Sequence, residues 1–480
     1  MQALDTVLRY EFLTKVQEAS LPACLSGVDV LARAKTGTGK TLGFLIPSVE
    51  RLARSPGGVP SGRVHVLVLS PTRELALQIA KEAAALLTHH QGLGVQCVYG
   101  GTNIKSEQSR LAGSRCDVLV ATPGRLVDHI QNTQGAAQRM AHVQVCVLDE
   151  ADQLLDMGFK EALDTICGAL PPQRQTLLFS ATVPTAVRTV AQRFLRRDHV
   201  FVDTVGDDSP HTAAAVKQCL VVAPFEAQIP MLVHLIRAAA AVDGHKVLVF
   251  FATARQAQFH AELLNGTGTP ALEIHSRMSQ PQRERASAAF RGARSAVMCS
   301  SDVSARGVDY PDVSAVIQVG APSDRSQYIH RLGRTARAGK SGDGVLLLAP
   351  HDAWVLHELR DLPLVQLEAQ VPTPQLLADV ARGLAHVDSK SAAQCYGAWL
   401  GLHNGLLRRL GWSKEELVQW ANAYSRTLGL PQPPALPANT VGKMGLRGVA
   451  GLIVERGPPG GGGGGRGGGG RGGGGGRGRH

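Results

Sequence analysis

The feature that most constrains this sequence is a glycine-rich loop, Ala-Lys-Thr-Gly-Thr-Gly-Lys-Thr, which runs from Ala34 to Thr41. Apolar residues at Val28, Val30 and Leu31 precede it, and the apolar stretch Leu42–Val49 follows it. This context predicts a strand, a loop and a helix. Such a loop points backbone N–H groups inward at a helix N-terminus and can cradle a phosphate chain. A tight strand–helix turn without a ligand is the alternative.

Positions within this loop have distinct expected roles toward a nucleotide. Lys40 would reach the β- and γ-phosphates, and the Thr41 hydroxyl would ligate Mg²⁺. Ala34 stands where the usual pattern has its first glycine, so the strict motif is not met. The expected nucleotide-binding residues of the loop are Thr36, Gly37, Thr38, Gly39, Lys40 and Thr41.

Length and charge set broader limits. The chain has 480 residues, and a length of this order indicates about two to four domains. The formal net charge of +11 favours a polyanionic partner. No run of about 18 apolar residues occurs, so no membrane span is expected. The eight cysteines are scattered without a CxxC pair, which favours buried free thiols over a zinc site or a disulfide framework.

Strand-like apolar runs alternate with helical patterns through two successive blocks of the sequence. Such alternation predicts βαβ units and parallel sheets, with ligands at the carboxyl ends of the strands. The runs of the first block are Val64–Leu69, Val95–Tyr99, Asp117–Ala121, Val143–Leu148 and Gln175–Phe179. Those of the second block are Gln218–Val222, Lys246–Phe251, Ala271–Ile274, Ser295–Cys299, Val313–Val319 and Gly344–Leu348. The expected fold class is α/β, with two parallel-sheet domains in tandem.

The pattern divides the chain into five parts. Residues 1–205 and 217–350 are the two α/β domains, and the polar residues 206–216 are the linker between them. From His351 the pattern changes to helices without strands, so residues 351–430 are expected to form a helical extension. Residues 431–480 begin with a proline-rich spacer and end in a Gly/Arg tail, which cannot bury a core and should be disordered.

Two carboxylates follow the apolar run that ends at Leu148. Such groups are costly at the end of a buried strand unless they are paired or lie near a metal. Opposite a phosphate loop, Asp149 would hold Mg²⁺ and Glu150 would polarise the attacking water. The alternative is an acidic N-cap for the helix that starts near Gln153, although an N-cap needs only one carboxylate.

The segment Asp149-Glu150-Ala151-Asp152, together with the glycine-rich loop, resembles the DEAD-box RNA helicases of superfamily 2. Gln17, with Phe12 and Thr14 before it, resembles their Q motif, which reads adenine. The other matching segments of the first block are Pro71–Ala76 (motif Ia), Gly100-Gly101 (GG motif), Thr122–Leu126 (motif Ib) and Ser180–Thr182 (motif III). The chain starts almost at its first motif, so a segment upstream of it is expected.

The second block resembles the same family. Its matching segments are Val249–Thr253 (motif IV), His275-Ser276 with Gln280–Arg283 (motif IVa), Ser301–Asp309 (motif V) and His330–Arg337 (motif VI). Ser301 stands where threonine is usual and keeps the hydroxyl. Ala336 stands where glycine is usual, and its methyl group restricts that turn. The resemblance implies that both domains are RecA-like.

The resemblance also implies roles for single residues. The expected catalytic residues are Lys40, Glu150, Arg334 and Arg337, and Asp309 contacts the ribose. Ser180 and Thr182 couple the nucleotide state to RNA binding. The expected RNA contacts are Arg73, Gly101, Thr122, Pro123, Gly124, Arg125, Thr253, Arg283 and Ser301. Backbone N–H groups, hydroxyls and cations of this kind suit a sugar–phosphate backbone.

The arginines of motif VI are spaced three residues apart. Arg331, Arg334 and Arg337 can therefore share one face of a helix, where like charges repel unless an anion compensates them. A solvated basic face is one interpretation. The other is that Arg334 and Arg337 reach the γ-phosphate across the cleft, as arginine fingers do.

The region after the second block contains all four tryptophans, and Trp399, Trp412 and Trp420 among them favour a packed core over ligand stacking. Residues Tyr396 to Tyr424 resemble the helical extension of mitochondrial RNA chaperones and their plant relatives. That likeness favours the mitochondrion or another organelle, although no transit peptide is visible; cytoplasm or nucleus is the alternative. Arg466, Arg471, Arg477 and Arg479 lie among the glycines of the tail and suit sequence-tolerant RNA tethering; an inert tail is the alternative.

Together these features predict an ATP-dependent RNA helicase or RNA chaperone with ATP and Mg²⁺ as cofactors. Its expected partner is RNA, single-stranded or a short duplex, bound without regard to sequence by a monomeric chain. An ATP-gated RNA clamp with slow hydrolysis and a DNA helicase are the alternatives. The 2′-hydroxyl distinguishes RNA from DNA.

Overall fold

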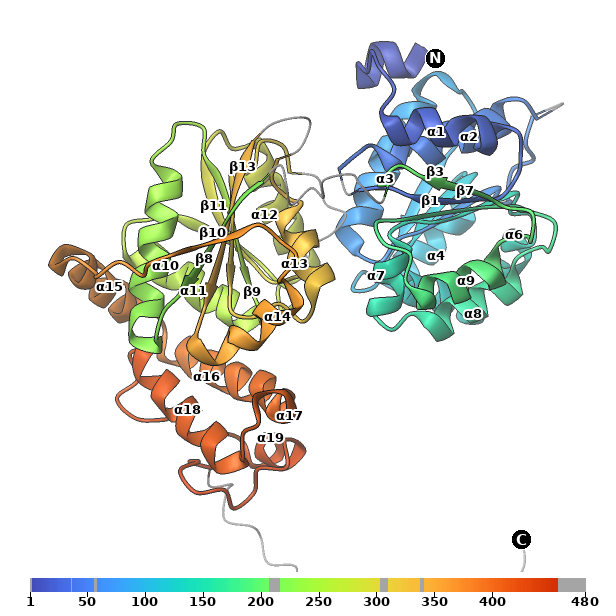
Figure 1. The fold of residues 1–480 in the computed structure, drawn as a ribbon. Coiled ribbons are helices and arrows are strands. Elements are labelled where there is room, and N and C mark those ends of the chain that lie inside the picture. The colour runs from blue at the N-terminus through green and yellow to red at the C-terminus, as the bar shows by residue number, and fades with distance from the viewer. Residues whose placement is uncertain are drawn as a thin grey trace, which may run out of the picture.

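In the computed structural model, two parallel α/β domains follow one another along the chain and a helical region packs against the second (Figure 1). The structure describes residues 2–35, 37–55, 58–206, 216–302, 310–336 and 341–455. Each domain has a seven-stranded sheet in this part of the chain. The predicted fold class is confirmed. No helix among the described residues combines the length and apolar character needed to cross a bilayer.

The first sheet has the strand order β3-β4-β2-β5-β6-β1-β7, and all its paired strands run parallel. Its strands are β1 (Val30–Arg33), β2 (Val66–Leu69), β3 (Val95–Val98), β4 (Val118–Ala121), β5 (Val145–Leu148), β6 (Gln175–Ser180) and β7 (Val200–Asp203). The central strands β2, β4 and β5 consist of buried apolar residues. This is the composition of strands that helices cover on both faces.

The helices of the first domain either precede β1 or supply the crossovers between these parallel strands. They are η1 (Leu4–Leu8), α1 (Lys15–Leu25), α2 (Lys40–Ala53), α3 (Arg73–Leu86), η2 (Leu87–His89), α4 (Ile104–Gly113), α5 (Pro123–Asn132), α6 (Ala136–Met140), α7 (Ala151–Asp156), α8 (Lys160–Ala169) and α9 (Thr185–Phe194). Two separate apolar cores result, one on each face of the sheet.

The second sheet has the order β10-β11-β9-β12-β13-β8-β14 and is also parallel. Its strands are β8 (Val216–Val222), β9 (Lys246–Phe251), β10 (Ala271–Ile274), β11 (Ala296–Ser300), β12 (Ala315–Val319), β13 (Gly342–Leu348) and β14 (Leu364–Leu367). Its helices are α10 (Phe225–Ala240), α11 (Ala254–Gly266), α12 (Gln280–Gly292), α13 (Arg325–Leu332), η5 (Pro350–Trp354) and α14 (Val355–Glu358).

The region beyond His351 differs in two ways from the predicted helices without strands. Strand β14 lies beyond His351 and pairs with β8 at the edge of the second sheet. Its residues are exposed or half-buried, so the run lacks the strong apolar signal of a central strand. The packed region also continues past residue 430, because Leu436, Val441 and Leu446 are buried and Leu436 bridges to Val454.

The helical extension shares a hydrophobic core with the second domain. Its helices are α15 (Pro374–His386), α16 (Ser389–Asn404), α17 (Leu407–Leu410), α18 (Lys414–Thr427) and α19 (Ala438–Lys443), and they lie against the second domain in Figure 1. Trp399 and Leu417 of the extension belong to the same buried cluster as Phe225 and Val249 of the second domain. Trp399 is therefore a core residue, as the sequence predicts, and Trp412 is half-buried against the same cluster, but the prediction is wrong for Trp420, which is 42% exposed.

A glycine allows α15 to approach α11 closely. A methyl group on Gly383 would come within 2.8 Å of the Leu263 carbonyl oxygen and 2.7 Å of Thr267 Cγ2. Contacts of this length with backbone cannot relax without moving a helix. The docking of the extension therefore requires glycine, which has no side chain, at this helix crossing.

We expect Gly383→Ala to reduce the unfolding free energy of the second domain and its extension by about 1–3 kcal/mol, because the added methyl overpacks the crossing. Gly168→Ala in α8 is the matched control, since nothing lies within 4 Å of the added methyl there. The control should change stability by less than about 1 kcal/mol, in the stabilising direction. Thermal unfolding of both variants measures the difference, and equal melting temperatures would show that the crossing is not tight.

Candidate functional site

The glycine-rich loop connects β1 to α2 at the carboxyl edge of the first sheet. Gly39 is the N-cap of α2 and has φ +89°, a left-handed conformation that favours glycine. A methyl group on Gly39 would also lie 2.6 Å from Gln17 Nε2. Thr38 Oγ1 donates to the carbonyl oxygen of Lys35 (2.8 Å) and closes the turn. Thr36 lies outside the described residues.

Gln17 holds this loop from the side. Its Nε2 donates to the Gly39 carbonyl oxygen (3.0 Å), and its Oε1 accepts from the Thr14 backbone N–H (3.0 Å). Thr14 is the N-cap of α1, so one buried amide links the start of α1 to the start of α2. The contact of Gln17 with adenine stays a prediction, and its support of the loop is a role that the sequence motif did not reveal.

Lys40 and Glu150 form a buried ion pair across the site. Lys40 Nζ lies 3.0 Å from Glu150 Oε1, and both side chains are at most 5% exposed. Burial alone would lower the pKa of Lys40, but the charges of Glu150, Asp149 and Asp152 outweigh it, and the pKa of Lys40 is raised above its ordinary value. The lysine is therefore held as a cation where a phosphate chain would lie.

The backbone of Glu150 is strained. Glu150 has φ +50° and ψ +55° and precedes the first residue of α7, yet its side chain makes no capping hydrogen bond. A non-glycine residue in this conformation costs free energy, and such strain clusters at functional sites. The alternative of a simple acidic N-cap is therefore excluded, because the carboxylate turns toward Lys40 instead.

Asp149 and Thr41 supply oxygen ligands at the same sheet edge. Asp149 follows β5 and Thr41 lies in the first turn of α2 after β1, with only β6 between the two strands. Burial, and then the charge of Glu150, raise the pKa of Asp149 to about 7. A buried carboxylate and a hydroxyl are ligands that suit Mg²⁺, and a cation would offset the charge that burial penalises.

Asp152, which lies beside the glycine-rich loop, contacts motif III and faces the second domain. Its Oδ2 accepts from Thr182 N–H (3.1 Å) and Thr182 Oγ1 (2.7 Å), while its own N–H donates to Ser180 Oγ (3.2 Å). The same Oδ2 lies 3.8 Å from His330 Nε2 of the second domain. The two predicted coupling residues therefore both contact Asp152, Thr182 at the carboxylate that faces motif VI and Ser180 at the backbone N–H.

Motif VI approaches the glycine-rich loop from the second domain. Arg334 is 1% exposed and lines, with Gly37, a cavity of about 530 Å³ between the domains. The expectation that the arginines share one helical face is wrong, because α13 ends at Leu332 and Arg334 lies in the turn beyond it. Arg331 instead donates from Nε to Asp302 Oδ1 (2.8 Å). Arg337 and Asp309 lie outside the described residues.

The turn after α13 carries the departure from the family motif. Ala336 has φ +52°, so a residue with a side chain occupies a left-handed position. Glycine adopts this conformation without the steric cost of a Cβ atom. The methyl group of Ala336 therefore adds strain to the turn, as the sequence comparison with the motif predicts.

A second group of predicted residues gathers where β2, β3 and β4 end. Arg73 starts α3 after β2, Gly101 follows β3, and Thr122, Pro123 and Gly124 start α5 after β4. These strands are neighbours in the order β3-β4-β2, so the residues share one edge. A methyl group on Gly101 would lie 2.6 Å from Arg73 Nη1, which places the guanidinium directly over the glycine backbone.

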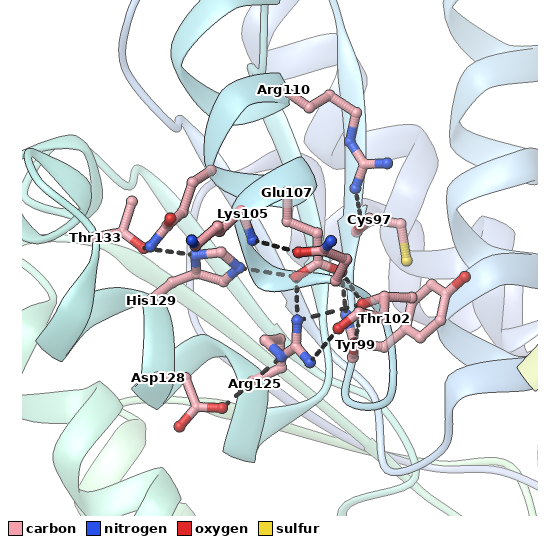
Figure 2. A network of polar contacts seen from close by, with 12 residues as sticks. Cys97, Tyr99, Thr102, Lys105, Glu107, Arg110, Arg125, Asp128, His129 and Thr133 are labelled. Carbon is pink, nitrogen blue, oxygen red and sulfur yellow. Dashed lines mark hydrogen bonds and ion pairs between the residues drawn. The ribbon is translucent and has the colours of Figure 1, made fainter.

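Arg125 lies behind this edge in a buried polar network (Figure 2). Its Nη1 donates to Glu107 Oε2 (2.7 Å), and its Nη2 donates to the Thr102 carbonyl oxygen (3.1 Å). Glu107 also contacts His129 Nε2 (2.9 Å) and accepts from Thr102 Oγ1 (2.5 Å). Arg125 thus fixes the loop after β3 to the start of α5, and its contact with RNA stays a prediction.

The sequence did not single out Glu107, His129 or Thr102. They lie on different elements, and a lone glutamate in an exposed-looking helix carries no local signal. Burial alone would raise the pKa of Glu107, but hydrogen bonds from His129, Thr102 and Arg125 hold it below its ordinary value. The carboxylate is therefore charged, and it compensates Arg125 in a site that excludes water.

A buried ion pair joins the two domains beside this edge. Arg283 Nη2 of α12 donates to Glu74 Oε2 of α3 (2.6 Å), and Gln280 Nε2 lies 3.4 Å from Glu74 Oε1. Arg283 and Glu74 are 5% and 6% exposed. Tyr99 of the first domain donates to Glu284 of the second (3.1 Å). Arg283, predicted as an RNA contact, is thus part of a cross-domain contact.

The other two predicted RNA contacts lie at strand ends of the second sheet. Thr253 caps α11 and accepts from the Gln256 N–H (3.2 Å). Ser301 follows β11 and is buried. Both stand at the carboxyl edge of the second sheet, as expected, and their contacts with RNA stay predictions.

Comparison with known proteins agrees with this geometry. The family model for the DEAD/DEAH box helicases matches residues 14–190, and that for the helicase conserved C-terminal domain matches residues 227–339. DEAD-box ATP-dependent RNA helicase 25 of Arabidopsis thaliana is 47% identical over 452 residues, which are 93% of this chain and 80% of that protein. The chain belongs to the DEAD-box helicase family.

Other relatives of this DEAD-box chain are longer. DEAD-box ATP-dependent RNA helicase 31 of Arabidopsis thaliana is 48% identical over 448 residues, which are 92% of this chain. The chain spans 62% of the length of helicase 31 and 52% of helicase 26 from the same plant.

The DEAD-box chain is also similar to solved structures of Mss116. A form of Mss116p that lacks the NTE and C-tail, bound to ssRNA and AMP-PNP, has a TM-score of 0.83 at 28% identity and covers 94% of this chain and 93% of its own. Mss116 bound to ssRNA and UDP-BeF has a TM-score of 0.84 at 28% identity, with 95% of each chain covered. The likeness includes the helical extension, because the 94% and 95% of this chain that are covered are more than the two α/β domains contain.

We expect Glu107→Gln to lower the unfolding free energy of the first domain by about 3 kcal/mol, because it leaves the buried Arg125 with only the exposed Asp128, 3.8 Å away, as a counter-charge. The pKa of Glu107 is depressed, so its stabilisation is present above the ordinary glutamate pKa and is lost as the pH falls through the folded value. The difference in unfolding free energy between the wild-type protein and the variant should therefore become smaller at low pH.

Thermal unfolding across this pH range measures the effect, with Glu161→Gln on the exposed face of α8 as the control. The control should melt like the wild-type protein at every pH. A Glu107→Gln variant that does the same would contradict the role of the network.

Proposed function

We propose that this chain is an ATP-dependent RNA helicase that locally unwinds or remodels RNA. The observation that carries the proposal is the link between two sites at one interdomain cleft. Beside the glycine-rich loop, Asp152 faces His330 of the second domain. Beside the edge with Arg73, Glu74 forms an ion pair with Arg283 of the second domain. A ligand at either site therefore acts on the same interface.

ATP would lie on the glycine-rich loop. The backbone N–H groups of the loop and the Lys40 ammonium group bind the phosphates, and Glu150 accepts a proton from the attacking water. Arg334 faces Gly37 across the cavity and would stabilise charge on the γ-phosphate. Thr41 and Asp149 would hold Mg²⁺, which neutralises phosphate charge when it is bound.

Hydrolysis requires the ammonium group of Lys40 to leave Glu150. In the present geometry Lys40 Nζ lies 3.0 Å from Glu150 Oε1, so the carboxylate is occupied by the ion pair. A γ-phosphate attracts Lys40 and releases Glu150 for the water. Nucleotide binding thus both supplies the substrate and frees the base.

RNA would lie along the edge that carries Arg73, Gly101 and Thr122. Burial, and then the positive charge of Arg283, lower the pKa of Arg73. A phosphate anion would relieve this repulsion. The groups at this edge are backbone N–H groups, hydroxyls and cations, which bind sugar and phosphate and not base edges. Recognition is therefore expected to be independent of sequence.

An RNA clamp that hydrolyses ATP slowly is the second candidate function. It uses the same residues and differs only in turnover and strand separation. The organellar location favoured by the helical extension stays a prediction.

We expect single-stranded RNA to stimulate steady-state ATP hydrolysis at least tenfold, because RNA and ATP complete the same interface. Glu150→Gln should lower the RNA-stimulated rate by about 10²–10⁴-fold, the usual contribution of a general base, while nucleotide binding persists. Glu226→Gln, on the exposed first turn of α10, is the matched control and should retain the full rate.

A strand-displacement assay with a short RNA duplex distinguishes the two candidate functions. Strand release that requires ATP supports the helicase, and RNA binding without release supports the clamp. ATP hydrolysis that ignores RNA, or that survives Glu150→Gln, would contradict the proposed coupling.

A further inference from the structure

Two histidines and an aspartate meet where the second domain joins the extension. His351 and Asp352 belong to η5 after β13, and His403 lies near the end of α16. One potential ligand atom from each of the three side chains lies within 4.8 Å of the other two. None of these residues is part of the nucleotide or RNA sites described above.

The hydrogen bonding of His403 leaves one ring nitrogen available. Its Nδ1 lies 3.0 Å from the Trp399 carbonyl oxygen, which can only accept a hydrogen bond, so Nδ1 carries the proton. A neutral imidazole whose N–H donates to a backbone carbonyl presents its other nitrogen as a metal ligand.

His351 points an unsatisfied nitrogen at the same place. Its side chain is 8% exposed, and its Nε2 has no hydrogen-bond partner among the described residues. That atom lies 3.8 Å from Asp352 Oδ1. A buried polar atom without a partner costs free energy that a ligand would recover.

Asp352 is a buried carboxylate that no lysine or arginine pairs with in the described part of the chain. The Ala349 N–H lies 3.3 Å from Asp352 Oδ2, so a backbone group orients the side chain. The group therefore lacks a counter-charge in a place where charge is costly.

We propose that His351, Asp352 and His403 form a binding site for a divalent transition-metal ion, with Zn²⁺ the best match to two nitrogen ligands and one oxygen ligand. The two rings are 5.3 Å apart between centroids and inclined by 69°. Two imidazoles on one tetrahedral zinc ion have centroids roughly 5 Å apart, given Zn–N distances of about 2.0 Å.

The site has room for a fourth ligand and a clear structural consequence. A cavity of about 170 Å³ lies beside the three side chains, lined also by Trp399 and Arg331. Water can complete the coordination there. Because His403 belongs to the extension and the other ligands to the second domain, a bound ion would link the two.

The competing explanation is that the histidines act only as aromatic core residues. His351 contacts the rings of Phe225, Trp399 and Trp420 at centroid distances of 5.1 to 6.0 Å. Such packing accounts for the burial of His351. Aromatic packing does not account for a buried carboxylate that lacks a counter-charge beside two imidazoles.

The test uses the full chain without a histidine tag, stripped with a chelator and then titrated with Zn²⁺ or Co²⁺. We expect one ion per chain, a rise in melting temperature on the order of 5 °C at saturation, and a tetrahedral Co²⁺ spectrum without a thiolate charge-transfer band. The absence of that band separates this site from binding by the cysteines.

Asp352→Asn and His403→Gln should each abolish the Co²⁺ spectrum and the Zn²⁺-dependent rise in melting temperature. Asp352→Asn keeps an oxygen that can accept from Ala349, so it should fold, and its circular dichroism with chelator present checks this. His245→Gln is the control, because His245 is only half-buried, lies outside the proposed site and bonds within its own turn. A chain that binds no ion, or variants that bind as the wild-type protein does, would leave only the aromatic core.

Discussion

The buried ion pair between Glu74 and Arg283 is the contact on which the assembled cleft depends. A buried pair gains little over two apolar groups, but loss of one partner leaves an uncompensated charge. Each charge here belongs to a different domain, so each domain alone exposes its charge to water. The pair forms only when the domains meet. This makes it suited to a reversible closure and poorly suited to permanent docking.

The interface between the two domains also includes residues of the nucleotide site. Asp152 accepts hydrogen bonds from the backbone N–H and the hydroxyl of Thr182 and faces His330, so the segment Asp149–Asp152, motif III and motif VI meet at one carboxylate. The network around Glu107 holds the RNA edge rigid from behind. Closure therefore brings together two preformed halves and does not build either of them.

The fold and the nucleotide half of the site could be predicted because their signals are local. Apolar runs mark the central strands, and Lys40 and Glu150 follow β1 and β5 in short motifs. The contacts of Gln17 with the loop could not be predicted, since they depend on how α1 packs beside α2. Glu107 and His129 were missed for the same reason.

Two errors have definite physical causes. The arginine spacing of motif VI fits a helix, but α13 ends at Leu332 and Gly333 follows, so Arg334 lies beyond the helix that carries Arg331. Strand β14 was missed because an exposed edge strand lacks the apolar run that marks a buried one. Pairing with β8, a contact remote in sequence, determines its conformation.

The most direct test of the account is the closed fraction of the two domains, measured by energy transfer between dyes at the exposed positions Glu161 and Glu226. With single-stranded RNA and a non-hydrolysable ATP analogue, the wild-type chain should close. Glu74→Gln and Arg283→Gln should each reduce closure, and the double variant should be no worse than the poorer single one, because both changes remove the same interaction. Closure that is unchanged in the single variants, or losses that add in the double variant, would contradict the account.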